Sequence, residues 1–341
     1  MNVKRFWQYV TVSVVFFVLV GCVPQPAGEL HLTGRTMGTT YNVKVNPAGT
    51  IDPQALQAEI DALLVHINDL MSTYQADSEL SRFNQHQSSD PFPLSAQTLD
   101  VMREAIRLGE LSEGALDVTI GPLVNLWGFG PQGRPKRVPT AVEIDNAMAR
   151  TGLHALELGP ESAVKHIPSL YVDLSTIAKG YAVDEIAELL ESRGENNYLV
   201  EIGGEMRLSG IKTNGDDWRI AIEKPVTNER AIQRVVTVGN NAIATSGDYR
   251  NYYEEDGVRY SHLIDPQSGQ PIQHNLVAVT VVHPSSMTAD GLATAFIVMG
   301  KEKAMQIAQQ NNLAILLITR ENDDFKEYTS DAFTRTVNVL N

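Results

Sequence analysis

The sequence contains a single cysteine, Cys22, among 341 residues. Beyond that position the chain has no thiol, which excludes a disulfide, a thiolate metal site and a cysteine nucleophile in the folded body. The chain also lacks an internal repeat and a long low-complexity stretch. Its composition, with 43% hydrophobic residues, 25 Gly and 16 Pro, is ordinary for a globular protein and sufficient for one large domain or two smaller ones.

Positive charge is scarce as well. The chain has 27 Lys and Arg against 41 Asp and Glu, which gives a formal net charge of −14. Residues 1–21 carry two positive charges and no negative ones, so the remainder has a net charge of −16. Such a surface does not attract nucleic acid, and we expect no nucleic acid partner. Because it would also repel a free dinucleotide, helix N-termini and a bound metal ion would have to supply local positive potential.

The N-terminal residues are typical of a bacterial lipoprotein leader. Lys4 and Arg5 form a basic region, and the apolar run 10–20 is too short to span a membrane comfortably. The run leads into Leu-Val-Gly-Cys at 19–22, where a small residue precedes the cysteine. An ordinary signal peptide and a signal anchor are the alternatives.

This interpretation divides the chain into three parts. We predict a signal peptide over 1–21, a lipidated Pro-rich tether over 22–29 and one domain over 30–341. Several acyl chains on Cys22 would anchor the mature protein stably outside the cytoplasmic membrane. The residue that follows Cys22 is Val23 and not an Asp, which favours the outer over the inner membrane.

Apolar periodicity and capping residues predict a mixture of helices and strands. The helices are expected at 53–70, 95–112, 140–151, 177–192, 289–299 and 302–311. Thr140 is expected to cap the third of them, with Glu143 as its partner in a capping box. The strands are expected within 31–45 as a pair, and at 170–174, 197–202, 205–209, 218–223, 235–238, 242–245, 261–264, 276–282 and 314–319. The two types follow one another without regular β-α-β alternation, which favours an α+β fold.

The segment 288–294, Thr-Ala-Asp-Gly-Leu-Ala-Thr, indicates a metal site at the start of a helix. Thr288 is a good N-cap, and Asp290 and Thr294 are four residues apart and share one helix face. A carboxylate and a hydroxyl together suit Mg²⁺, which prefers oxygen ligands and shares its coordination with substrate phosphates. The alternative is that Asp290 only complements the helix dipole.

The segment 170–180 predicts a strand that runs directly into a helix capped by Ser175 or Thr176. A helix N-terminus presents unpaired backbone N–H groups to an anion. Lys179 in the first turn can neutralise phosphate charge, and Gly180 allows close approach. The alternative is a capped helix with an exposed lysine.

Two histidines are candidates for a general base. His262 ends an alternating strand beside Asp265 and a turn that contains Gly and Pro, which suggests an open position facing a substrate. His283 precedes the helix that contains Asp290 and is the competing candidate. A histidine on a strand is also often only a hydrogen-bonded structural residue, and we rank His262 first.

Several motifs follow one another in the order typical of the ApbE family, which the chain resembles over roughly residues 30–335. The motifs are MGTTY, MSTY followed by SELSRFN, GALDVTIGPLVNLWGFG, DLSTIAKGYAVD, YLVEIGGEMRLSG, ATSGDYRNYY, YSHLIDPQSGQP and TADGLATA. Members of this family are periplasmic FAD:protein FMN transferases, and a lipoprotein leader is consistent with that location. The resemblance implies a T-fold-related α+β architecture of mixed and antiparallel sheets with flanking helices, and an FAD cleft between two halves.

The resemblance also implies roles for individual residues. It implies that His262 is the catalytic base. It implies Mg²⁺ ligands at Asp290, Thr294 and the carbonyls of Ala178 and Ala293. It implies contacts to FAD from Met37, Tyr74, Ala115, Leu116, Asp117, Ser175, Lys179, Tyr181 and Ile264.

The expected activity is Mg²⁺-dependent transfer of FMN from FAD to a Thr or Ser hydroxyl of an acceptor flavoprotein, with release of AMP. The resemblance suggests acceptors such as subunits of the sodium-pumping NADH:quinone reductase. A Mg²⁺-dependent FAD pyrophosphatase that uses water as acceptor is one alternative. A lipid-anchored flavin-binding protein without turnover is the other.

Overall fold

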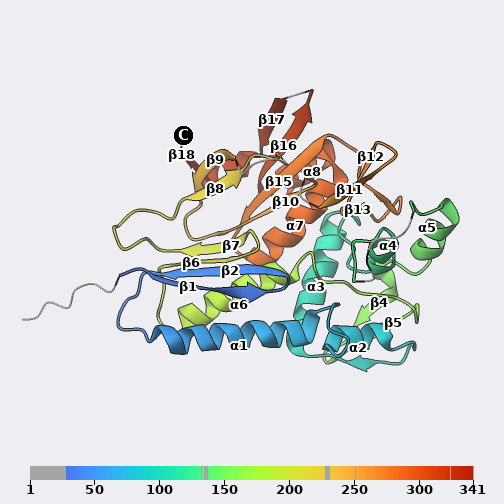
Figure 1. The fold of residues 1–341 in the computed structure, drawn as a ribbon, viewed down its shortest axis with the longest axis horizontal. Coiled ribbons are helices and arrows are strands. Elements are labelled where there is room, and N and C mark those ends of the chain that lie inside the picture. Colours follow the sequence, from blue (N-terminus) through green and yellow to red (C-terminus); the bar gives the residue numbers. More distant parts are fainter. Residues whose placement is uncertain are drawn as a thin grey trace, which may run out of the picture.

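A long antiparallel sheet runs through the molecule and carries helices on one face (Figure 1). The computed structural model describes residues 28–131, 133, 137–226, 231–249, 251–322 and 324–340. The predicted leader and tether up to residue 27, with Cys22, lie outside the described residues. In spatial order the sheet consists of β1 (Leu30–Thr36), β2 (Thr39–Val45), β6 (Tyr198–Ile202), β7 (Glu205–Ser209), β10 (Ala242–Gly247), β15 (Leu276–His283), β16 (Ala314–Glu321) and β17 (Asp324–Thr329).

Helices cover the sheet because their apolar side chains bury its apolar face, and α7 is buried on nearly every side. The helix α7 (Ser286–Met299) packs on β10 and β15, and α6 (Ala178–Ser192) packs on β6 and against α7. The remaining helices are α1 (Pro53–Met71), α2 (Glu79–Gln85), α3 (Ala96–Leu111), α4 (Gly121–Leu126), α5 (Ala141–Met148), α8 (Lys301–Gln310), α9 (Asp331–Thr336) and the 3-10 turn η1 (Leu153–Ala155). No helix in the described part of the chain is long and apolar enough to cross a membrane.

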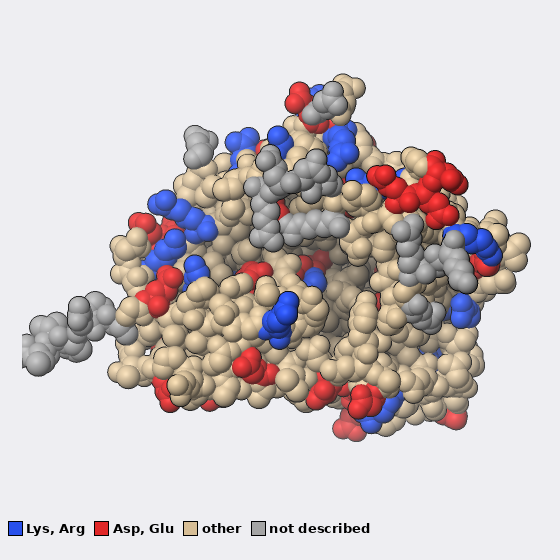
Figure 2. Space-filling view, in the orientation of Figure 1, with Lys and Arg blue, Asp and Glu red and all other residues tan. Residues whose placement is uncertain are grey.

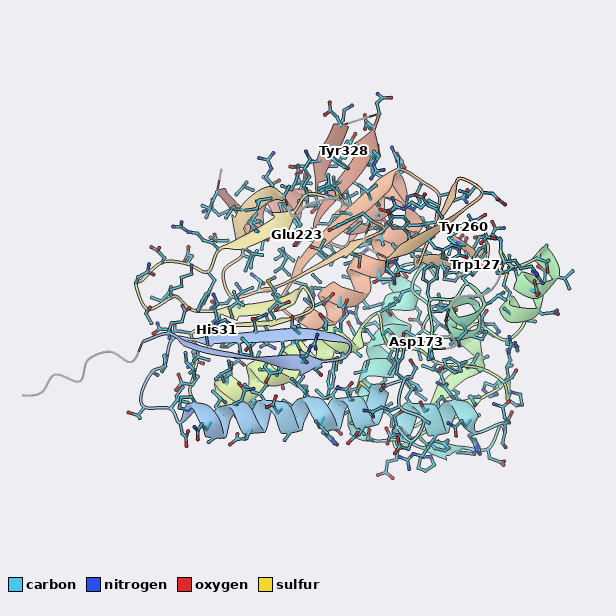
Figure 3. The ribbon with its side chains drawn as sticks, in the orientation of Figure 1. His31, Trp127, Asp173, Glu223, Tyr260 and Tyr328 are labelled. Atoms are coloured by element: carbon cyan, nitrogen blue, oxygen red, sulfur yellow. The ribbon has the colours of Figure 1, made fainter. Side chains whose placement is uncertain are left out.

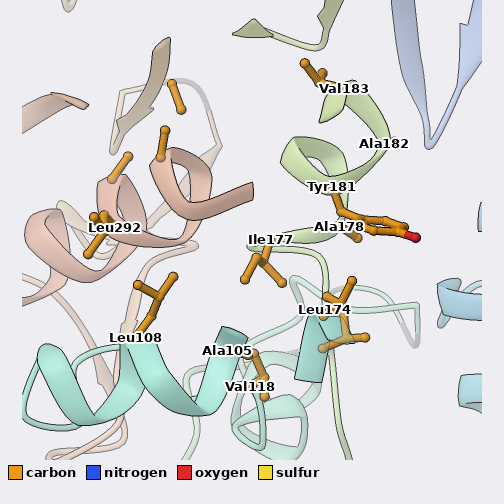
Figure 4. Close-up of a cluster of buried hydrophobic side chains, with 14 of the residues drawn as sticks. Ala105, Leu108, Val118, Leu174, Ile177, Ala178, Tyr181, Ala182, Val183 and Leu292 are labelled. Carbon is orange, nitrogen blue, oxygen red and sulfur yellow. The ribbon is translucent and has the colours of Figure 1, made fainter. Parts of the chain in front are cut away.

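The main core lies where α3, α6 and α7 meet (Figure 4). Leu108, Ile177 and Leu292 are fully buried there. A second core, which contains Trp218 and Phe333, involves the sheet β18–β9–β8. The short strands are β3 (Phe92–Pro93), β4 (Leu156–Leu158), β5 (Ser162–Lys165), β8 (Ile220–Glu223), β9 (Ile232–Thr237), β11 (Tyr252–Glu255), β12 (Val258–Ser261), β13 (Ile264–Asp265), β14 (Gln270–Pro271) and β18 (Asn338–Leu340).

These elements confirm the α+β prediction and most of the predicted ranges. The capping box predicted at Thr140 is present, with Glu143 as its partner. The predicted strand 261–264 is wrong, because β12 ends at Ser261 and β13 begins at Ile264. His262 lies in the break between them. Several short elements were not predicted from the sequence, among them α2, α4, α9 and β17.

The prediction for the start of α7 is wrong by three residues. Its N-cap is Ser285, whose side chain accepts a hydrogen bond from the Thr288 backbone N–H. The Thr288 hydroxyl instead donates to Glu104 on α3, at 2.7 Å. The helix begins early because the Asp184 carboxylate of α6 accepts the N–H groups of Ser286 and Met287, at 2.9 and 3.0 Å.

The predicted strand 170–174 and the predicted caps of α6 are wrong as well. Only Tyr171 of this segment forms a bridge, to Ile120. Val172 bonds instead to the side chain of Asn84, so the segment is extended without belonging to a sheet. The N-cap of α6 is Ile177, whose apolar side chain cannot accept a capping hydrogen bond. Ser175 does not cap the helix, and its hydroxyl donates to Asp173 instead.

Candidate active site

A cavity of about 650 Å³ lies between residues of the N-terminal and C-terminal halves. Figure 2 shows the molecule hollowed near its centre, with acidic and basic side chains inside the hollow. The position agrees with the predicted cleft between two halves. Twelve of the residues predicted for the site line the cavity: Met37, Tyr74, Ala115, Leu116, Asp117, Ser175, Ala178, Lys179, His262, Ile264, Asp290 and Thr294.

Two predicted residues do not line the cavity. Tyr181 belongs to the main core beside Leu174 and Ala178, and its hydroxyl interacts with Glu185 (Figure 4). Ala293 is completely buried in α7. Tyr181 follows the cavity residue Lys179 by two positions and Ala293 directly precedes Thr294, but helical rotation turns both side chains into the core.

The close approach of α6 to α7 depends on Gly180. A Cβ atom at this position would lie 2.3 Å from the carbonyl oxygen of Ser286 and 2.8 Å from the Asp290 Cβ atom. Without one, the Gly180 backbone N–H donates to Asp290 Oδ2 at 3.0 Å. The first turn of α6 therefore holds the carboxylate of α7 in place.

Asp184 fixes the same pair of helices one turn further along α6. Besides its two backbone bonds, its carboxylate accepts the Ser285 hydroxyl at 2.8 Å and pairs with Arg207 at 3.1 Å. A carboxylate at a helix N-terminus satisfies unpaired N–H groups and complements the dipole. Asp184 thus sets where α7 begins, and with it the positions of Asp290 and Thr294.

Lys179 lies between two buried carboxylates. Its Nζ is 2.8 Å from Glu205 Oε1 and 3.5 Å from Asp290 Oδ1. Burial alone would lower the pKa of Lys179, but the two carboxylates outweigh it and hold the pKa above its ordinary value. Burial raises the pKa of Asp290, and Lys179 partly offsets that effect. Sequence reasoning missed Glu205, which begins β7 after the turn Gly203–Gly204.

The oxygen atoms of α7 and β10 fit a hard cation. Asp290 and Thr294 both line the cavity, and the Thr294 hydroxyl is 3.2 Å from the hydroxyl of Ser246. In the described part of the chain, no three His, Cys, Asp or Glu side chains cluster as metal ligands would. A cation here would thus have one protein carboxylate, neutral oxygens and substrate phosphates, which suits Mg²⁺ better than zinc.

His262 faces the cavity in a fixed orientation. Its Nδ1 is 3.0 Å from the carbonyl oxygen of Asn251, which also accepts the His262 backbone N–H at 3.1 Å. In the neutral ring Nδ1–H donates to this carbonyl, which leaves the Nε2 lone pair available. The ring also meets Phe129 edge-on, with 6.2 Å between centroids. Burial lowers the pKa of His262 below its ordinary value, with a smaller effect from Lys179.

The competing histidine does not line the cavity. His283 Nδ1 accepts the backbone N–H of Ser285 at 3.1 Å, at the start of α7. Its ring is therefore part of the loop that leads into the helix. The geometry favours His262, as the ranking from the sequence did.

Stacked aromatic rings form a wall beside His262. Centroid distances are 5.4 Å for Trp127–Tyr260, 5.3 Å for Tyr253–Tyr260 and 5.5 Å for Phe129–Tyr253. The Trp127 indole also donates to the carbonyl of Gly269, at 2.8 Å. Figure 3 shows Trp127 beside Tyr260, so the α4 loop and the β11–β12 hairpin support each other. The motif GALDVTIGPLVNLWGFG contains Trp127 and Phe129, and only the fold brings them against Tyr260 and Tyr253.

Comparison with known proteins places this arrangement in a family. Residues 37–317 match the ApbE family. The chain belongs to the ApbE family. A protein of Vibrio cholerae serotype O1 named FAD:protein FMN transferase is 56% identical over 330 residues, which cover 96% of this chain and 98% of that one. A Haemophilus influenzae protein of the same name is 49% identical, with 90% and 91% covered.

Solved structures of ApbE proteins share the fold. The flavin transferase ApbE from Vibrio cholerae matches with a TM-score of 0.86 at 56% identity, covering 91% of this chain and all of that one. The apo flavinyl transferase ApbE of Pseudomonas stutzeri matches with a TM-score of 0.84 at 42% identity, covering 90% and 96%. The resemblance inferred from the motifs is thus confirmed along nearly the whole described chain.

Proposed function

We propose that this ApbE protein transfers FMN from FAD to a Thr or Ser hydroxyl of an acceptor flavoprotein and releases AMP. The observation that carries the proposal is a single cavity that holds a base of fixed tautomer, His262, together with Lys179 and the oxygen pair Asp290 and Thr294. The relatives named FAD:protein FMN transferase support it. Flavin-carrying subunits of the sodium-pumping NADH:quinone reductase are the acceptors we propose to test first.

The reaction breaks the phosphoanhydride bond of FAD and forms a phosphoester bond to the acceptor. The acceptor oxygen bonds to the phosphorus on the FMN side, and the bond from that phosphorus to the bridging oxygen of AMP breaks. His262 Nε2 takes the proton of the attacking hydroxyl. Lys179, which lines the same cavity, would offset charge on the pyrophosphate. Mg²⁺, when bound, would draw charge off the pyrophosphate and stabilise the departing AMP.

Incubation of the protein with FAD, Mg²⁺ and a candidate acceptor subunit tests the proposal. Covalent flavin on the acceptor is read by in-gel fluorescence, and FMN and AMP are separated by chromatography. We expect a fluorescent acceptor and one AMP per flavin attached. Free FMN without labelled acceptor would indicate a pyrophosphatase, and unchanged FAD would indicate a flavin carrier.

We propose further that Cys22 carries lipid that anchors the protein at the periplasmic side of a membrane. The support is the leader over residues 1–21, which ends in a glycine directly before Cys22, and the short Pro-rich segment that follows the cysteine. Replacement of the thiol in Cys22→Ser should abolish acyl labelling and cleavage at this site, and the variant should remain unprocessed. Metabolic labelling with a fatty-acid analogue and membrane fractionation measure this. A wild-type protein that takes up no label and fractionates as soluble contradicts the proposal.

A further inference from the structure

Glu205 is a buried carboxylate to which the reaction above gives no role. It is 6% exposed, lies at the start of β7, which contacts α7, and is among the residues that line the cavity. Its Oε1 pairs with Lys179, while its Oε2 has no hydrogen-bond partner among the described residues. A buried carboxylate is costly unless an opposite charge accompanies it, so Glu205 requires this lysine.

The same lysine lies within reach of Asp290. The three groups come from β7, α6 and α7, and form a row with the ammonium between two carboxylates. The ammonium is 2.8 Å from Glu205 but 3.5 Å from Asp290, so it is held on the Glu205 side. An ammonium group on a flexible four-carbon stem acts as a tethered cation, and it competes with a metal ion for any carboxylate it can reach.

We propose that Glu205 is a positioning residue that draws Lys179 away from Asp290 and so leaves the Asp290 carboxylate available to a divalent cation. The inference rests on the metal site of the proposed function. Glu205 acts on the cation through Lys179 and does not itself coordinate it. Without the Glu205 charge, the nearest anion for the lysine is Asp290.

The substitution Glu205→Gln tests this with little structural disturbance. The amide oxygen of Gln can still accept from Lys179, and the amide nitrogen takes the place of Oε2, which has no partner to lose. Glu205→Asp is a second variant that keeps the charge, and it should weaken cation binding less than Glu205→Gln. Glu201→Gln is the matched control, since Glu201 lies on the same β6–β7 hairpin and bonds instead to Gly204 and Asn42.

The experiment measures the binding of Mn²⁺ alone, using the electron paramagnetic resonance signal of the unbound ion. The two substitutions are combined in a double-mutant cycle. Glu205→Gln should weaken Mn²⁺ binding at least about tenfold. Lys179→Met should then restore Mn²⁺ affinity in the Glu205→Gln background. This gain in affinity should be at least about tenfold larger than any gain that Lys179→Met gives in the wild-type background. Glu201→Gln should leave the affinity unchanged, and thermal melts should show that every variant is folded.

Each other outcome overturns the inference for a different reason. If Lys179→Met changes the Mn²⁺ affinity by the same factor in both backgrounds, the two charges act independently and Glu205 does not position the lysine. A loss in Glu205→Gln that Lys179→Met does not restore means that Glu205 is itself a ligand. If the wild type binds no Mn²⁺, the metal site fails together with this inference, whereas flavin transfer to an acceptor would still be measured separately.

Discussion

Replacement of Asp290 by Ala is expected to abolish flavin transfer. Asp290 is the one carboxylate we assign to the cation, and it lies at the α6–α7 contact with its Oδ2 fixed by Gly180. Loss of the cation removes several kcal/mol of transition-state stabilisation, so we expect a decrease in rate of about 10³-fold or more. Asp290→Asn should be nearly as defective, because it keeps the shape and loses the charge. Thr294→Val should be milder, since a hydroxyl is a neutral ligand.

Single-turnover labelling of an acceptor, with and without EDTA, measures the rate of flavin transfer in each variant. Asp69→Ala is a suitable control, because Asp69 is an exposed residue of α1 and not part of the cavity lining. Thermal melts of Asp290→Ala should show a folded protein, because burial disfavours the charged form of this carboxylate in the native state. Full activity in EDTA, or in Asp290→Ala, would remove the basis for the metal site.

Replacement of His262 by Ala is expected to separate chemistry from binding. His262 is assigned to removal of the acceptor proton, so the variant should bind FAD with near-native affinity. Acceptor labelling should fall by the factor typical of a general base, about 10²- to 10⁴-fold. FAD titration and single-turnover labelling of the same preparation measure the two effects. His283→Ala, outside the cavity, is the control and should retain transfer.

The pH dependence of the wild-type rate follows from the same assignment. The base works in its neutral form, and burial lowers the pKa of His262. The rate should therefore be constant near neutral pH and fall only as the pH drops through a value below about 6.5, the ordinary pKa of histidine. His262→Ala should lack this decrease. If the variant loses FAD binding as well, His262 is a binding residue, and if it loses nothing, His283 becomes the candidate.

Local patterns in the sequence determined a large part of this picture. Asp290 and Thr294 share a helix face because the α-helix has 3.6 residues per turn, and the sequence alone shows that spacing. The same holds for Lys179 and Gly180 in the first turn of α6, and for the capping box at Thr140. The irregular mixture of strands and helices indicated α+β, and the ordered motifs indicated the family.

Tertiary structure decided what depends on groups distant in the chain. The start of α7 is set by Asp184, 101 residues before Ser285, so no local capping rule could place it. The choice between His262 and His283 depends on which ring faces the cavity. Tyr181 and Ala293 are excluded from its lining because packing turns them into the core. Glu205 enters the site because the sheet brings β7 beside two helices, and only the folded chain places its charge next to Lys179.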